Sequence, residues 1–272
     1  MKIRPVREYF SQFLFSLAMI PQAITFIKKK RLWEGVLSYG WVSRILLIGA
    51  VIGGFKFMGI FLKWMGHMQN DSPQAVVSQM GVLAKDLAIG SYDLLFSSGS
   101  KFIMLALLEV AIFHFARRAL AELTGKDKDI TWNDFVVAEI RMIKVTGLSW
   151  LLTLLFSIGF SIFFGIFGFL AWMKPILNFG VQCFFLGFAV LDNYQEQFHM
   201  GIRESLKFSQ NFIGVAMALG IFLYFVLMVP IAGAIAAPCI AAVAATMVMY
   251  KLSDLHLHGV NHDHKPKYEE MI

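Results

Sequence analysis

Charged residues are scarce in this chain, and one long stretch has none. Only 15% of the 272 residues are Asp, Glu, Lys or Arg, whereas 58% are hydrophobic. Residues 208–250 contain no Asp, Glu, Lys, Arg or His. Because a soluble domain needs charged side chains over its surface, this composition excludes a soluble protein and predicts an integral membrane protein.

Cysteine is also rare, and the familiar catalytic motifs are absent. Cys183 and Cys239 both lie in apolar stretches, so we expect neither a disulfide framework nor a cysteine metal site. The sequence has no P-loop, GxGxxG or HExxH motif and no nucleophile with base spacing, so we expect no enzyme and no cofactor. The net charge is +6, but the basic residues gather beside apolar segments. Membrane topology and anionic lipid explain that pattern better than nucleic acid does.

The uncharged region 208–250 is about twice the length of one bilayer-spanning helix, so it crosses twice or enters and turns back. Pro230, Gly233 and Pro238 near its middle predict the hairpin tip, because proline breaks the helical hydrogen-bond ladder and glycine tolerates unusual backbone shapes. Residues 145–191 repeat this plan around Pro175. We therefore expect two helical hairpins.

The rest of the chain completes a single membrane domain over residues 1–272. Residues 1–41 are predicted to lie in the membrane interface, residues 42–123 to form two long spans ending near Gly125, residues 126–144 to form a surface helix, and residues 251–272 to form a His-rich cytoplasmic tail. The fold class is an all-α membrane protein with two long transmembrane helices and two hairpins, or alternatively six full transmembrane helices. Lys and Arg concentrate on one side, which predicts that both termini are cytoplasmic.

Several motifs together resemble one family. An apolar arm begins at Pro175-Ile176-Leu177 and ends in the acidic and aromatic segment Asp192-Asn193-Tyr194. A hairpin centre, Pro230-x7-Pro238, is followed by the small residues of Ala244-Ala245-Thr246-Met247. The second span is followed by the helix stop Leu123-Thr124-Gly125. This pattern resembles the CysZ-like sulfate permease family, to which the eukaryotic etoposide-induced membrane proteins are related.

The resemblance implies a sulfate permease of the bacterial inner membrane that forms homo-oligomers, with short hairpins that do not fully cross. In that family a Gly-x-Arg-Arg turn before the first long span binds the anion. This chain instead has a basic segment of Lys28, Lys29, Lys30 and Arg31 without the glycine. A glycine-assisted turn presents backbone N–H groups and arginine adds bidentate hydrogen bonds that lysine cannot copy, so the anion site differs.

Two groups of charged residues are candidate transport sites. The basic segment is predicted to bind an anion, and the alternative is a topology anchor held by anionic lipid. Lys56 and Glu109 lie inside predicted spans at comparable depth and are predicted to line a path, with His114 as a proton-handling group. The alternatives are a structural ion pair, or a snorkelling Lys56 with a buried, protonated Glu109.

The remaining candidates are weaker. His256, His258, His262 and His264 could hold a divalent metal, but a disordered, solvated tail is the favoured interpretation. Asp192, Glu196 and His199 are expected to solvate a cytoplasmic loop. Five glycines are expected to form helix contacts: Gly159, Gly165, Gly168, Gly180 and Gly187.

The leading hypothesis from the sequence is a permease or channel for a small inorganic anion, sulfate by resemblance. The alternative is a non-transporting scaffold or membrane-shaping protein that holds anionic lipid. The expected partners are the lipid bilayer, the anion and further copies of the chain, with no nucleic acid. The two hypotheses differ in whether Lys56 and Glu109 are in contact with water: a permease predicts that they are, and a scaffold predicts a dry pair or a lipid-facing surface.

Overall fold

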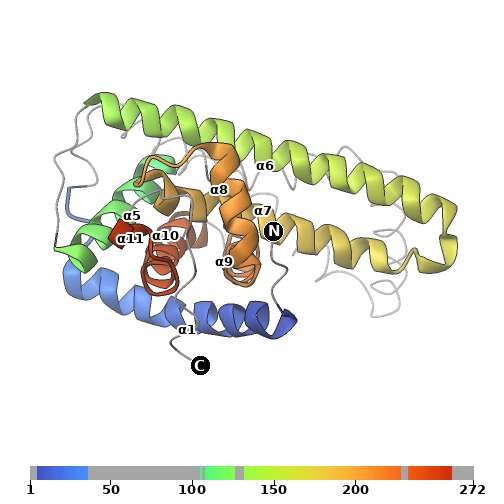
Figure 1. Cartoon of the computed structure of the whole chain (residues 1–272), viewed down its shortest axis with the longest axis horizontal. Coiled ribbons are helices and arrows are strands. Elements are labelled where there is room, and N and C mark those ends of the chain that lie inside the picture. The colour runs from blue at the N-terminus through green and yellow to red at the C-terminus, as the bar shows by residue number, and fades with distance from the viewer. Residues whose placement is uncertain (1–4, 36–104, 106–107, 126–131, 228–231, 259–272) are drawn as a thin grey trace, which may run out of the picture.

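The computed structural model describes residues 5–35, 105, 108–125, 132–227 and 232–258 (Figure 1). All regular elements in these ranges are helices, in agreement with the all-α class. Five of the described helices are long and apolar enough to cross a membrane. The predicted span at residues 42–64, including Lys56, and most of residues 102–108 lie outside the described residues.

Helix α1 (Val6–Lys30) is amphipathic along its length. Its buried residues recur every three or four positions, as one face of a helix requires: Gln12, Ser16, Met19, Ile20 and Ala23. The helix ends at Arg31, which adopts the left-handed conformation with φ 49° and donates its N–H to the Ile27 carbonyl oxygen. The helix is long enough to span a membrane, so its predicted place in the interface stays a prediction.

Helix α5 (Glu109–Thr124) ends where the sequence predicts. Gly125 follows it with φ 70°, and its N–H binds the Ala121 carbonyl oxygen. Left-handed backbone costs little at glycine, so a C-terminal glycine stops a helix readily.

The predicted hairpin over residues 145–191 forms a helical pair. Helix α6 (Trp132–Ile166) runs out to the 3-10 turn η2 (Gly168–Leu170), and α7 (Met173–Glu196) returns beside it (Figure 1). Pro175 lies in the first turn of α7, where a missing N–H costs no hydrogen bond. The predicted surface helix at residues 126–144 is not separate, because α6 is continuous from Trp132 and no proline or glycine interrupts it before Gly147.

The uncharged region over residues 208–250 differs from its predicted layout. After α8 (Ile202–Ser209) and the short 3-10 turn η3 (Gln210–Phe212) come α9 (Ile213–Val226), α10 (Ala232–Leu252) and α11 (Leu255–His258). Pro238 lies inside α10 and Gly233 in its first turn, so the prediction that Pro238 forms the hairpin tip is wrong. Membrane helices tolerate an internal proline because neighbouring helices support the freed backbone groups. Pro230 lies outside the described residues.

Helices α9 and α10 form the centre of the described bundle, with α1, α5 and α7 packed around them. Close approach depends on small residues in this region, such as the fully buried Ala241, Ala242, Ala244 and Ala245 of α10. Helix α6 lies at one edge in Figure 1, and most of its apolar stretch is exposed. An exposed apolar helix of this kind suits contact with lipid or with other protein in a membrane.

Candidate functional site

The basic segment lies at the carboxyl end of α1. Lys28, Lys29 and Lys30 occupy the last turn of the helix, and Arg31 is its C-cap. Cations are favourable there because the unsatisfied carbonyl groups give a helix a partial negative charge at its carboxyl end. All four residues are exposed, so the helix presents the segment to its surroundings.

The four cations divide into two pairs. Lys30 Nζ lies 2.7 Å from Glu122 Oε2 of α5, and Arg31 Nη1 lies 3.5 Å from Glu34 Oε1. The hydrogen bond and charge of Lys30 lower the pKa of Glu122 below its ordinary value. Lys28 and Lys29 form no ion pair with any residue that the structure describes. An incoming anion therefore meets Lys28 and Lys29 without competition from those carboxylates.

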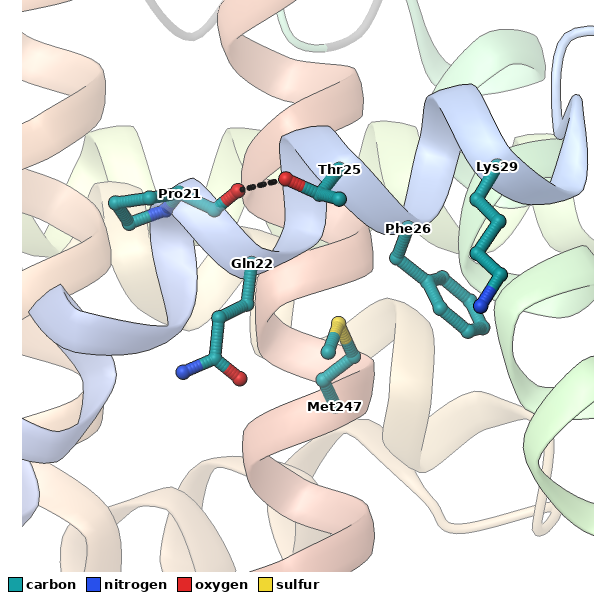
Figure 2. A pocket seen from close by; sticks show the side chains of 6 residues that line it. All are labelled: Pro21, Gln22, Thr25, Phe26, Lys29 and Met247. Carbon is teal, nitrogen blue, oxygen red and sulfur yellow. Dashed lines mark hydrogen bonds between the residues drawn. The ribbon is translucent and has the colours of Figure 1, made fainter.

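An open groove of about 370 Å³ lies beside Lys29, between α1 and α10 (Figure 2). Its lining combines one cation and one amide with apolar groups: Pro21, Gln22, Thr25, Phe26, Lys29 and Met247. Figure 2 shows Gln22, Phe26 and Lys29 extending from the same side of α1, where Met247 of α10 lies. The groove can therefore take a small anion at Lys29 or the apolar chain and headgroup of an anionic lipid.

Of the three predicted path-lining residues, Glu109 and His114 lie on α5, and Lys56 lies outside the described residues. The His114 side chain is buried, and its Nε2 is 2.8 Å from the Leu32 carbonyl oxygen. A carbonyl oxygen only accepts hydrogen bonds, so Nε2 carries the proton and donates it. This bond ties α5 to the segment after α1. The role of His114 in proton handling stays a prediction.

Glu109 of α5 is buried, with 1% exposure. A separate charged group that the sequence did not predict is centred on Arg141 of α6. Arg141 donates from Nε and Nη2 to the two carboxylate oxygens of Asp192 on α7, at 2.9 and 2.8 Å. Glu196 Oε2 lies 3.8 Å from Arg141 Nε. A bidentate pair of this kind fixes both the distance and the orientation of the two helices.

The same group also binds the chain after α7. Arg141 donates a third hydrogen bond to the Met200 carbonyl oxygen. The Ser205 hydroxyl of α8 contacts Asp192 Oδ1 and Gln195 Oε1, and Gln195 Nε2 donates to Ser209 Oγ at 2.8 Å. Asp192, Gln195, Ser205 and Ser209 are all buried. The cluster therefore joins α6, α7 and α8 through polar contacts shielded from solvent.

The expectation that Asp192 solvates a loop is wrong, because only 1% of this residue is exposed. His199 is exposed and has φ 59°, as expected of a loop residue. One signal in the sequence pointed to the cluster. Asp192, Gln195 and Glu196 are spaced i, i+3 and i+4, which places three polar side chains on one helix face. No comparable pattern marked Arg141, which the sequence groups with the other basic loop residues.

Of the five glycines expected to form helix contacts, one contacts a neighbouring helix closely. A Cβ built on Gly187 would lie 1.8 Å from the Ala216 carbonyl oxygen, so this glycine does form a close helix contact. A Cβ on Gly159, Gly165, Gly168 or Gly180 would meet no described residue within 4 Å, so the expected contacts of these four are not found in the described part of the chain.

The predicted histidine metal site falls largely outside the described residues. His256 and His258 lie in α11, and the His256 ring packs on Tyr250 at 4.1 Å between centroids. His262 and His264 lie outside the described ranges. Within the described ranges no group of three or more His, Cys, Asp or Glu side chains is arranged to hold a metal ion.

Comparison with known proteins adds no assignment. No family model, no curated protein and no solved structure matches this chain. The functional argument therefore depends on the residues of the chain itself.

Proposed function

We propose that the protein is a membrane permease or channel for a small inorganic anion, with sulfate as the substrate suggested by the motifs that resemble the CysZ-like family. One observation carries the proposal: Lys28 and Lys29 are exposed at the end of α1, and Lys29 borders the groove against α10. Two adjacent lysines away from the carboxylates of Glu34 and Glu122 attract an anion to the protein surface.

The proposed setting is the bacterial inner membrane, with both termini in the cytoplasm and several copies in one assembly. Five candidate spans among the described helices support a multi-pass arrangement. We favour two full spans plus two hairpins that enter and turn back, with six full crossings as the alternative. The basic segment would then lie at the cytoplasmic surface, where positive residues concentrate.

The two lysines without ion pairs and the two cations with ion pairs can be compared in a matched experiment. The variant K28Q/K29Q removes the two lysines without ion pairs to described residues, and K30Q/R31Q removes the same charge from the two residues that have them. Purified protein would be reconstituted in liposomes, and uptake of labelled sulfate would be measured. We expect K28Q/K29Q to lose most of the uptake and K30Q/R31Q to retain more. Uptake no higher than in empty liposomes, by correctly inserted wild-type protein, would refute the permease proposal.

A scaffold that binds anionic lipid is the second candidate, and the apolar lining of the groove favours it. Phe26, Met247 and Pro21 provide contacts for an acyl chain, while Lys29 would face the phosphate of the headgroup. This function predicts that K28Q/K29Q weakens lipid retention during purification while wild-type protein transports no sulfate. Lipid analysis by mass spectrometry beside the uptake assay separates the two candidates.

A further inference from the structure

Two buried hydroxyl groups of α6 lack the hydrogen bond that similar groups elsewhere in the structure make. Four buried hydroxyls, three inside helices and one directly after α10, donate to the carbonyl oxygen four residues earlier, at 2.6–2.9 Å: Ser16, Thr153, Thr246 and Ser253. Thr146 and Ser149 are 4% and 0% exposed, within the 0–8% range of those four residues. Neither hydroxyl oxygen has a hydrogen-bond partner in the described part of the chain.

The unpartnered hydroxyls of Thr146 and Ser149 have an energetic cost. A buried hydroxyl without a partner costs about 1–3 kcal/mol, whereas the bond to the carbonyl four residues earlier is available to serine and threonine in any helix. Thr153, one turn further along the same face, makes that bond. The hydroxyl groups of Thr146 and Ser149 are therefore available to bind a group other than the backbone of α6.

Two N–H groups of α6 and α7 also lack a partner: Trp150 follows Ser149 directly, and Gln182 lies further along the helix pair, near the Phe156 and Phe185 contact. Trp150 Nε1 and Gln182 Nε2 are buried and have no hydrogen-bond partner among the described residues. Thr146, Ser149 and Trp150 share one face of α6, because they are spaced i, i+3 and i+4. Gln182 belongs to α7, which packs antiparallel to α6 with Phe156 and Phe185 in ring contact at 6.2 Å. All four groups can donate a hydrogen bond, and an anion accepts hydrogen bonds.

The charged cluster lies at one end of this row of donors. Thr146 follows Arg141 by five residues, roughly 7.5 Å along the helix axis. Asp192 already binds the Arg141 guanidinium. The donors of the row are hydroxyl, indole and amide groups, which carry no charge. Neutral donors suit an ion in transit, because conduction requires binding that is favourable enough to enter and weak enough to leave.

We propose that Thr146, Ser149 and Trp150 of α6 form a binding site for a small inorganic oxyanion, with Gln182 of α7 as the donor further along the path. The role of this site in conduction rests on the proposed permease function. Binding itself does not depend on it.

Asn193 Oδ1 also lacks a hydrogen-bond partner in the described part of the chain. Three oxygen atoms, from Asn193, Thr146 and Ser149, would favour a cation instead of an anion. The experiment must therefore separate anion from cation.

The test compares T146V/S149A with T153V, whose hydroxyl already has a backbone partner. Thermal unfolding of the purified full chain in detergent would be followed in sodium sulfate and in sodium gluconate at equal sodium concentration. Sulfate also stabilises proteins non-specifically, and that effect is common to all variants. We expect an additional sulfate-dependent rise in Tm for wild type and T153V that T146V/S149A loses. W150F, which removes the N–H donor together with part of the ring, is expected to reduce the rise.

Two results would overturn the site: an equal sulfate effect in wild type and T146V/S149A, or an equal rise for both salts, which would indicate a cation. The single variants T146V and S149A repeat the test if the double variant does not fold. Sulfate uptake by the same proteins distinguishes the two proposals. Equal sulfate uptake by wild type and T146V/S149A would support the permease function but show that the anion does not pass through this site. A specific Tm effect without uptake supports the site and refutes the permease.

Discussion

Gly187 of α7 packs directly on the backbone of Ala216 of α9, and Gly220 of α9 packs in the same way on Cys183 of α7. A Cβ at Gly187 would lie 1.8 Å from the Ala216 carbonyl oxygen, and a Cβ at Gly220 would lie 1.7 Å from the Cys183 carbonyl oxygen. The two contacts are one helical turn apart on each helix. This reciprocal pair sets how closely α7 and α9 approach, as small residues do in membrane helix packing.

We therefore expect Gly187→Ala to destabilise the protein by about 1–3 kcal/mol, because the added methyl group overlaps backbone that cannot move independently. Gly180→Ala in the same helix is the matched control, because a Cβ at Gly180 meets nothing within 4 Å. It is expected to be neutral or to stabilise by up to about 1 kcal/mol through helix propensity. Thermal unfolding in detergent measures both, and equal Tm values for the two variants would contradict the tight crossing.

The Arg141 and Asp192 pair should behave as a buried ion pair. Asp192→Asn leaves the guanidinium without its bidentate partner and is expected to cost about 3–5 kcal/mol. Glu196→Gln is expected to cost less, because Glu196 is 3.8 Å from Arg141 and makes no hydrogen bond with it. The double variant R141M/D192L should recover part of the loss, because neither charge remains buried. Additive losses in the double variant would show that the two residues do not act as a pair.

The Lys30 and Glu122 contact gives a pH-dependent prediction. Lys30 lowers the pKa of Glu122, so the carboxylate favours the folded state at pH values above its ordinary pKa of 4.5. That contribution is lost as the pH falls through the lowered pKa. The Tm of wild type should therefore exceed that of E122Q at pH 6–7 and converge with it in acid. A Tm difference that is constant down to pH 3 would contradict the pairing.

Two glycines in open surroundings test the backbone conformation alone. Gly125 and Gly147 both have nothing within 4 Å of an added Cβ, but only Gly125 has a positive φ, at 70°. Gly125→Ala is expected to cost about 1–2 kcal/mol, because L residues disfavour left-handed backbone. Gly147→Ala, inside α6, should instead stabilise by up to about 1 kcal/mol. Circular dichroism melts in detergent would reveal the opposite signs.

Local properties of the sequence predicted much of the helical layout. The apolar arms on either side of Pro175 indicated the α6 and α7 pair, and Gly125 indicated the end of α5. The same reasoning failed at Pro238, which was assigned to a tip and lies inside α10. Proline weakens a helix by itself, but its effect inside a bundle depends on the helices around it.

The sequence by itself determined the all-helical class, the membrane character and the place of the cationic end of α1, because charge and hydropathy act residue by residue. Only the tertiary structure decided which residues meet. Arg141 and Asp192 are 51 positions apart, and nothing local indicates that they bind. Gly180 and Gly187 look alike in sequence, but a Cβ would meet the backbone of α9 at Gly187 and no described residue within 4 Å at Gly180. Such contacts depend on how each helix is rotated about its axis, and packing of the whole bundle sets that rotation.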